Sequence, residues 1–547
     1  MEAFSLFTRP QRYIGNEWNV IKKSHQDRIK ICLCYPDLYE IGMSNLGLRI
    51  IYGLLNQYDD VVCERVFLPS QDYIEFLKKK NEPLSSLETK TALYKFDVVG
   101  FNLNYELNFL NFLKVLHLGG IPIESSNRDI LVLVGGLPNP EPIASFVDVF
   151  FIGEFEEKAD IFINILRKYK DKNARLLALS EIEGFYVPSL YEVSFENNKY
   201  IFKKKYKNAI FPINRVYVKD INNSFYPTKW LVPHTQIVHD RAQIEIARGC
   251  PNRCKFCQAR SIYYPYREKK IDILLKLTEQ IYKLSGYENF SFLALSASDF
   301  SHIEELIELT IFYFKKFKIG ISLPSLRIDD IVDRLYKKLL ANKKTSLTLA
   351  VEVASDSLRE KLGKKIDTRK IFEAASILKS LGIQHIKLYF MFGLPYEAEE
   401  DILAIGSFLK RLVDATNIRL NVSINIFVPK PFSFWQSFSM EDVNILEYKR
   451  RLIFKNIPRK NIINVNVASP KYSILEAILS RADRDFCKVI KNVFLKNIDI
   501  DYLDKNYLFK IFMDAIEDEK IDYIRYLKVT SENFAWSFIK NPCEPNN

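Results

Sequence analysis

The sequence predicts an α/β protein with an N-terminal doubly wound parallel sheet, a central full or partial (β/α) barrel and a C-terminal, mostly helical region. Two stretches of the 547-residue chain, up to about residue 180 and from about 236 to 430, alternate short apolar strands with helical patterns. The segment between them is aromatic and Asn-rich, which indicates a small β-rich connector. We therefore expect domains at 1–180, 181–235, 236–435 and 436–547.

The first domain begins with "RIKICLCYPD" (28–37), an apolar run that ends at a Pro turn and precedes a helical pattern from Ser44 to about Asn56. Further short β-branched runs, typical of a buried parallel sheet, are "VVCERVF" (61–67), "FDVVGFNL" (96–103), "ILVLVGG" (130–136) and "VDVFFIGE" (147–154). Ligands of doubly wound sheets bind beyond the carboxyl ends of the strands. The loops "GGLPNPEP" and "IGEFEE" follow two of these ends.

The central region holds six candidate strands, most of them followed by a helical segment. They are "QIEIARG", "FSFLALSASD", "GISLPSLRID", "TSLTLAVEVAS", "HIKLYFMFGLP" and "LNVSINIFVPK". This alternation favours a full or partial barrel, whose catalytic face lies at the carboxyl ends of its strands. After about residue 440 the pattern is mostly helical, as in "SILEAILSRADRD".

The composition is that of an ordinary globular protein, with 48% hydrophobic and 27% charged residues. No run approaches the ~18 apolar residues of a membrane span, and the N-terminus does not read as a signal peptide. The scattered cysteines suit a reducing cytosol, so we expect a cytoplasmic protein; they are Cys32, Cys34, Cys63, Cys487 and Cys543. The formal net charge of +11 is compatible with a polyanionic substrate such as RNA, and equally with a merely soluble surface.

The segment "EIARGCPNRCKFCQARS" (245–261) places Cys250, Cys254 and Cys257 in the spacing C-x3-C-x2-C. A structural zinc site needs four ligands, commonly as two close pairs, and no second pair follows here. Fe–S clusters usually take four cysteines, so three would leave one iron of a 4Fe–4S cluster open to an exogenous ligand. An open coordination position is typical of catalytic metal sites.

This motif, placed after the first strand of a barrel, resembles the signature of the radical S-adenosylmethionine superfamily. The resemblance implies a 4Fe–4S cluster on the three cysteines, with S-adenosylmethionine (SAM) bound to the open iron. It also implies an electron donor such as flavodoxin or ferredoxin. Its expected chemistry is reductive cleavage of SAM to methionine and a 5′-deoxyadenosyl radical.

The resemblance assigns roles to five further residues. Phe256 matches an aromatic position beside the adenine. "LALSASD" replaces the family's Gly-Gly-Glu stretch, so Ser296 and Ser298 would have to contact the methionine amine through hydroxyls. Arg327 and Glu352 stand at strand ends where the family contacts the ribose and the methionine. At each position the alternative is a buried or solvated barrel residue.

A closer resemblance covers nearly the whole chain. "YPDLYEIGMSNLGLRIIYGLLN", "ERVFLPS", "GCPNRCKFCQAR" and "EAILSRADRD" are similar to segments of a bacterial radical SAM family with an N-terminal cobalamin-binding-like domain, whose reaction is not settled. If that domain binds cobalamin, we expect Gly135, Gly136, Gly153 and Glu154 beside the cofactor, where glycines permit close approach. Tyr39 stands where the lower-ligand signature D-x-H-x-x-G has histidine, so bound cobalamin would be base-off. The alternative is a retained fold without cofactor.

Three functions remain open at this point. The first is methylation or a related modification of an RNA or ribosome-associated substrate. The second is a small-molecule methylase or cyclase of lipid or cofactor metabolism, and the third is a metal-binding interaction protein without turnover. Methylthiolation is less expected. Such enzymes carry three further N-terminal cluster cysteines, and of the three in this domain, Cys32, Cys34 and Cys63, the first two lie within one strand.

Overall fold

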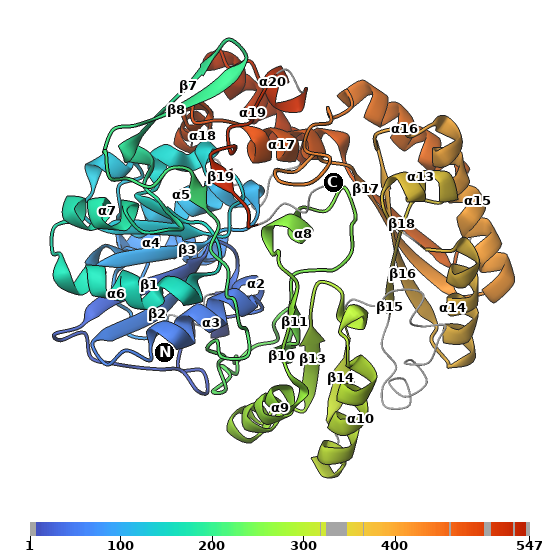
Figure 1. Ribbon diagram of the computed structural model, residues 1–547, viewed down its shortest axis with the longest axis horizontal. Coiled ribbons are helices and arrows are strands. Elements are labelled where there is room, and N and C mark those ends of the chain that lie inside the picture. Colours follow the sequence, from blue (N-terminus) through green and yellow to red (C-terminus); the bar gives the residue numbers. More distant parts are fainter. Residues whose placement is uncertain are drawn as a thin grey trace.

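The computed structural model describes residues 7–317, 319–323, 347–364, 366–458, 461–496, 505–528 and 531–542 (Figure 1). Its N-terminal domain is a six-stranded sheet in the order β2-β1-β3-β4-β5-β6. The first five strands in the chain pair in parallel, and the last is antiparallel to β5. The strands are β1 (Ile29–Tyr35), β2 (Val61–Phe67), β3 (Val98–Asn102), β4 (Leu131–Gly135), β5 (Val149–Phe151) and β6 (Phe185–Tyr186).

Helices cover both faces of this sheet, as a doubly wound fold requires. One face packs against α3 (Leu46–Leu55), α6 (Ala159–Lys168) and α7 (Lys172–Ser180), and the other against α4 (Gln71–Lys80) and α5 (Phe109–Leu118). The period-two alternation of β1 serves both cores, because Ile31 and Leu33 face the α3 side while Cys32 and Cys34 face the α5 side. The predicted doubly wound sheet is confirmed. Two short helices, α1 (Gln11–Ile14) and α2 (Tyr39–Gly42), complete the domain.

The connector holds a β-hairpin of β7 (Tyr191–Glu196) and β8 (Lys199–Lys204). It also holds β9 (Ile213–Asn214), which pairs in parallel with β19 (Ile539–Lys540) close to the C-terminus. Residues more than 300 positions apart in the sequence therefore share one small sheet.

The central domain consists of two arcs of parallel strands (Figure 1). The first arc has the order β10-β13-β14, and the second β15-β16-β17-β18. The strands are β10 (Ala242–Glu245), β13 (Asn289–Leu293), β14 (Gly320–Ser322), β15 (Leu347–Glu352), β16 (His385–Phe392), β17 (Arg419–Ile426) and β18 (Ile463–Val467). All six predicted strands are present. β18 lies in the region for which the sequence indicated mostly helices, and it extends the second arc as a seventh strand.

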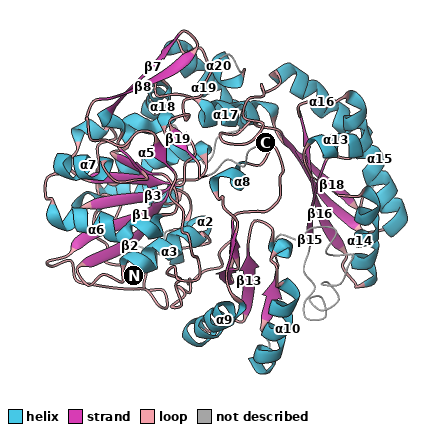
Figure 2. Cartoon of the chain, in the orientation of Figure 1, coloured by secondary structure: helices cyan, strands magenta, loops and turns pink. Residues whose placement is uncertain are grey.

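Helices line the outer side of these arcs (Figure 2). They are α9 (Ile271–Ser285), α10 (Ile303–Phe314), α14 (Thr368–Ser380), α15 (Glu399–Thr416) and α16 (Val443–Asn456), whereas the short α13 (Asp356–Lys361) packs in the cluster around Phe256 of the cysteine segment. The antiparallel ribbon of β11 (Ala247–Arg248) and β12 (Arg267–Glu268) leaves the first arc and encloses the cysteine segment, which ends in α8 (Gln258–Ile262).

The C-terminal helices join the two large domains. They are α17 (Pro470–Arg481), α18 (Phe486–Leu495), α19 (Lys505–Asp518) and α20 (Ile524–Leu527). The Asn139 side chain donates hydrogen bonds to the Ser480 and Ala482 carbonyl oxygens, and the Arg484 guanidinium pairs with buried Glu141. One apolar core runs through the N-terminal sheet, the second arc and these helices. No helix among the described residues is long and apolar enough to cross a membrane.

Candidate active site

The three cysteines lie on one loop, between β11 and α8, at the carboxyl ends of the barrel strands (Figure 1). Cys257 is the residue immediately before α8, and its backbone N–H donates to the Cys254 carbonyl oxygen. All three are partly exposed, whereas the other four described cysteines are buried. Partial exposure distinguishes a reactive or ligand cysteine from a structural one.

The loop is held from both arcs of the barrel. On the first arc, the Asn252 side-chain amide donates to the Asp299 carboxylate at 2.5 Å. On the second, the Lys255 backbone N–H donates to the Leu362 carbonyl, and the Trp435 N–H donates to the Lys255 carbonyl. The Phe256 ring packs with an apolar cluster at the strand ends that contains Val353, Leu358, Leu362, Leu394, Phe427 and Trp435. These contacts fix the cysteine loop at the mouth of the barrel.

The three cysteines are the type of ligand that an iron–sulfur cluster takes, and in a cubane cluster each of them would bind a different iron. Among the described residues, no group of three His, Cys, Asp or Glu side chains is placed to hold a single metal ion. Burial raises the pKa of Cys254 to about 11 and also raises that of Cys257.

Glu352, at the end of β15, faces the same loop. Its φ of +67° is uncommon for a residue other than glycine and coincides with a β-bulge in the pairing of β15 with β16. Its carboxylate accepts from the Lys364 ammonium at 2.7 Å. The charges of both Glu352 and Lys364 act on the Cys254 thiol. A strained backbone that carries a carboxylate to this loop is typical of a functional position.

Ser296 and Ser298 lie in the turn after β13, and both are buried. The Ser296 hydroxyl donates to the Asp299 carboxylate at 2.6 Å, the same carboxylate that holds Asn252 of the cysteine loop. The "LALSASD" stretch therefore brings an acidic group to the loop through Asp299. Arg327 lies outside the described residues.

A cavity of about 530 Å³ lies between the carboxyl ends of the N-terminal sheet and the first barrel arc. Its apolar part runs between the sheet and the helices α3 and α6, and is lined by Ile31, Leu33, Val98, Leu133, Ile51, Leu55 and Phe162. Its polar part is lined by Asn45, Asn102, Asn104, Gln243, Glu245 and Arg248. Gly249, next to Cys250, is also part of the lining. The cavity therefore extends from the first domain to the cysteine loop.

The four residues predicted beside cobalamin line this cavity, with different local roles. Gly135 leaves open space, since an added Cβ would meet only the Phe151 carbonyl oxygen, at 3.9 Å. Gly136 has a φ of +99°, and an added Cβ would lie 2.9 Å from the Leu103 carbonyl oxygen. Gly153 has a φ of +130° and forms a β-bridge with Val216, whose carbonyl oxygen an added Cβ would overlap at 2.1 Å. Gly153 thus serves a close backbone contact with the connector.

Glu154 is fully engaged in a buried ion-pair cluster. Its carboxylate accepts from the guanidinium groups of Arg248 and Arg267 and from the Val218 backbone N–H. The two arginines and this N–H hold the pKa of Glu154 below its usual range despite burial. Arg248 also pairs with Glu156 and Glu245. Glu154 therefore joins the N-terminal sheet to the barrel at the wall of the cavity.

Two family descriptions match the chain around this site. Residues 47–188 match "Radical SAM proteins, N-terminal", and residues 244–409, which include the cysteine loop, match "Radical SAM superfamily". The chain belongs to the radical SAM superfamily. The predicted class of enzyme, with its 4Fe–4S cluster and its use of SAM, is confirmed.

Similar proteins differ in how much of this radical SAM enzyme they cover. An uncharacterized protein of Methanocaldococcus jannaschii is 28% identical over 494 residues, which are 90% of this chain and 97% of that protein. The ribosomal protein uS12 methylthiotransferase RimO of a Thermoanaerobacter species is 23% identical over 185 residues, 31% of this chain and 40% of RimO.

Two solved structures superpose on parts of this chain at low identity. The radical SAM methyltransferase TsrM from Kitasatospora setae superposes with a TM-score of 0.49 at 12% identity, and 75% of each chain is covered. The cobalamin-dependent SAM radical enzyme OxsB superposes with a TM-score of 0.49 at 13% identity, over 91% of this chain and 72% of OxsB.

We call the cavity of about 530 Å³ between the N-terminal sheet and the first barrel arc the interdomain cavity. Tyr39 is not among the residues that line it. The side chain is buried under the sheet, and its hydroxyl donates to the Glu17 carboxylate at 3.0 Å. Arg65 binds the same carboxylate and that of Glu88, so the tyrosine belongs to a buried polar network of the N-terminal domain. Tyr39 thus contributes to the structure of the domain.

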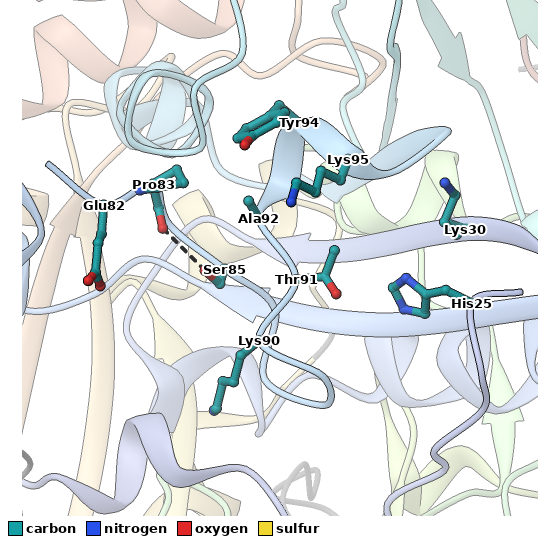
Figure 3. A pocket seen from close by; sticks show the side chains of 10 residues that line it. All are labelled: His25, Lys30, Glu82, Pro83, Ser85, Lys90, Thr91, Ala92, Tyr94 and Lys95. Carbon is teal, nitrogen blue, oxygen red and sulfur yellow. Dashed lines mark hydrogen bonds between the residues drawn. The ribbon is translucent and has the colours of Figure 1, made fainter.

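A second cavity, of about 600 Å³, lies at the opposite, amino-terminal edge of the sheet (Figure 3). Lys30 at the start of β1 and Lys95 just before β3 line it, together with His25, Tyr94 and Lys90. Its lining shares no residue with the interdomain cavity. We assign no part of the radical SAM chemistry to it.

The structure adds Asp299 and Gln243 to the residues that the sequence indicated. Asp299 is the last residue of "LALSASD". Its carboxyl group could have marked it as a site residue in the sequence, since the Gly-Gly-Glu stretch of the family also ends in an acid. Gln243 carried no signal, because one glutamine in an apolar strand cannot be told from a solvated residue. Its position at the cavity follows only from the packing of β10 against the Ser44 loop.

Proposed function

We propose that this radical SAM enzyme is a cobalamin-dependent methylase that binds cobalamin in the interdomain cavity. The proposal rests on where the interdomain cavity begins and ends. It begins at the carboxyl ends of the N-terminal sheet, where doubly wound folds bind their ligands, and ends at Gly249 beside the cysteine loop. A group bound there lies next to the cluster site, as a methyl donor for a substrate radical must.

The chemistry of the lining supports cobalamin. The slot between the sheet, α3 and α6 is apolar and suits the flat base of the nucleotide tail, and Gly135 leaves the room that a side chain would fill. The asparagine and glutamine side chains of the polar part match the amide groups on the rim of a corrin ring. When bound, cobalamin supplies a transferable methyl group. Tyr39 is engaged with Glu17, so we propose that the cobalt takes no ligand from it.

For SAM we propose the residues around the cysteine loop. Cys250, Cys254 and Cys257 hold the cluster, whose reduced form supplies the electron that cleaves SAM. Phe256 packs at the strand ends, where the adenine would lie against it. Glu352 and the Ser296–Asp299 turn offer acceptors for the ribose and the methionine amine, and Arg327 is proposed to contribute a cation.

The N-terminal cysteines favour methylation over methylthiolation. Cys32, Cys34 and Cys63 are fully buried within the sheet. Cys32 and Cys34 share the α5 face, whereas Cys63 belongs to the opposite core. Three ligands divided between two faces of a sheet cannot hold one cluster, so these residues do not replace the additional cluster of a methylthiotransferase.

For the substrate we propose an RNA or a ribosome-associated macromolecule, modified in the cytosol with electrons from a flavodoxin or ferredoxin. Support comes from the net charge of +11 and from the partial similarity to RimO, whose name assigns it a ribosomal protein substrate. Lysines on the β7–β8 hairpin, Lys199, Lys203 and Lys204, are exposed and add to the positive surface.

The test is turnover of the full chain under anaerobic conditions. Protein purified without oxygen is supplied with dithionite, SAM and methylcobalamin, together with the RNA that co-purifies with it. We expect 5′-deoxyadenosine and a methylated nucleotide, with both lost in Cys254→Ala and kept in Cys487→Ala. Formation of the methylated nucleotide without any dependence on cobalamin would contradict the proposal. Methylation of a co-purifying small molecule in place of RNA would reject the RNA substrate and favour the small-molecule reaction.

A further inference from the structure

We propose that the Arg260 guanidinium raises the reduction potential of the iron–sulfur cluster, because its positive charge offsets the negative charge that the cluster gains with an electron. Arg260 acts on the cluster through its charge and need not touch SAM or substrate. The inference concerns the cysteine loop alone, so it depends neither on the cobalamin site nor on the substrate proposed above.

The observation is a buried cation without a counterion. Arg260 lies in α8, shortly after the ligand Cys257, and is 8% exposed. Its Nη1 atom is buried and has no hydrogen-bond partner within the part of the chain that the structure describes. The ionisable groups that act on it most strongly are Arg253 and the three cysteines, and none of them is a carboxylate. A buried charge without a counterion is costly, so this guanidinium indicates a nearby negative charge that the carboxylates of the chain do not supply.

The guanidinium is held beside the cysteine loop. It lies over the Phe434 ring, with its central carbon 4.3 Å from the ring centroid. The next residue, Trp435, donates its backbone N–H to the carbonyl oxygen of Lys255, which lies between two of the cysteines. The segment that supports the guanidinium is therefore bonded directly to the loop. A cation–π contact of this kind fixes the position of a charge without neutralising it.

Reduction of a cluster on three thiolates adds one negative charge to this loop. A fixed cation nearby stabilises the reduced form more than the oxidised form, and such a charge acts through space, without contact. Net charge is among the factors that set the potentials of Fe–S clusters. An arginine also keeps its charge at every pH at which the protein is folded.

Other cations near the loop are screened or paired. Arg253 and Lys255 are exposed, so water and salt weaken their effect on the cluster. The Lys364 ammonium is bound by the Glu352 carboxylate at 2.7 Å. Arg260 is thus the cation of the cysteine segment whose charge should affect the cluster most.

The experiment is a redox titration of the anaerobically reconstituted full-length protein, without SAM or cobalamin, in which electron paramagnetic resonance measures the reduced cluster. Iron and sulfide contents are determined first, so that only loaded protein is compared. Arg260→Gln should make the cluster about tenfold harder to reduce, which for one electron is a shift of about 59 mV to more negative potential. Arg260→Lys keeps the charge and should restore most of the wild-type potential.

The matched control is Arg253→Gln, which removes an exposed arginine from the same loop and should shift the potential much less. An unchanged potential in Arg260→Gln, or an equal shift in Arg253→Gln, would overturn the proposal. The same holds if Arg260→Lys shifts the potential as far as Arg260→Gln does. Should Arg260→Gln fail to hold a cluster, Arg260→Lys decides. Loading that lysine restores supports the role of the charge, whereas loss of the cluster in both variants would show that the shape of the arginine is needed and its charge is not.

Discussion

The Glu154 carboxylate and the Arg248 guanidinium form an ion pair of 2.9 Å that joins the N-terminal sheet to the barrel beside the cysteine loop. Both side chains are 9% exposed, and Arg267 binds the same carboxylate at 2.8 Å. The pair forms part of the wall of the interdomain cavity. This contact, together with the C-terminal helices, therefore connects the two domains at the cavity.

Glu154→Gln should destabilise the protein by about 3 kcal/mol, because it removes one partner of a buried pair and leaves the arginines undercompensated. The free energy of unfolding in guanidinium chloride measures the effect. The control is Asp60→Asn, which breaks the exposed pair with Arg167 and should cost at most about 1 kcal/mol. Equal effects of the two variants would contradict the assigned role of Glu154.

The same ion pair has a defined pH dependence. The folded-state pKa of Glu154 is lowered, so its stabilising effect is full above the unfolded pKa of about 4.3 and is lost as the pH falls through the lower folded value. The difference in unfolding free energy between wild type and Glu154→Gln should therefore shrink below about pH 4. If this difference in unfolding free energy stayed constant down to pH 3, the lowered pKa of Glu154 would be contradicted.

Ionisation of Glu397 should have the opposite effect, so that stability falls as the pH rises. It is buried, and burial raises its pKa to about 7 even though the Lys449 ammonium lies 2.7 Å away. A raised carboxyl pKa lowers stability as the pH rises from about 4.5 to 7, by up to the order of 3 kcal/mol. Relative to Glu397→Gln, wild type should thus lose stability between pH 5 and pH 7.5. Parallel unfolding curves over this range would exclude the raised pKa.

Replacing Cys250, Cys254 and Cys257 together with alanine should abolish iron and sulfide binding in anaerobically reconstituted protein. The wild-type protein should bind about four of each and absorb near roughly 400 nm, as Fe–S proteins do. Chemical iron and sulfide analysis measures this. Stoichiometric zinc without sulfide in wild type would contradict the cluster.

Glu352→Ala should weaken SAM binding by roughly ten- to a hundredfold, the equivalent of a charge-assisted hydrogen bond, while the cluster stays intact. We expect the same of Arg327→Ala. Calorimetric titration of the cluster-loaded protein gives the dissociation constants, and Glu360→Ala, an exposed residue of α13, is the control. Normal SAM affinity in both variants would show that these side chains do not contact SAM.

Local patterns were enough to predict the sheets, and they singled out the cysteine loop as the expected cluster site. Period-two alternation and β-branched runs marked β1 to β5 and the six predicted barrel strands, because buried parallel strands are continuous apolar segments. The cysteine spacing lies within eight residues, so it needed no tertiary information. β18 was missed because its sequence, "INVNV", is short and half polar, and it forms only against β17.

The long-range contacts of the site could not be predicted in this way. Glu154 looked like a residue beside a ligand, since it ends a sheet strand, but its partners Arg248 and Arg267 lie 94 and 113 positions further along the chain. Gly153 was expected beside a cofactor and does line the cavity, but no pattern in the sequence indicated that its positive φ also serves the bridge to Val216. Such pairings depend on the docking of two domains, which periodicity does not encode.

The central claim is that cobalamin binds between the sheet and the cysteine loop, and the electron paramagnetic resonance spectrum of bound Co(II) cobalamin tests it most directly. The full-length protein, loaded with its cluster, is mixed with cobalamin and reduced in steps. We predict stoichiometric binding with a base-off signal, since the tail occupies the apolar slot and the Tyr39 hydroxyl is held by Glu17. No binding at high micromolar cobalamin would contradict the account. So would nitrogen coordination of the cobalt, by the cofactor's own base or by His239 at the cavity.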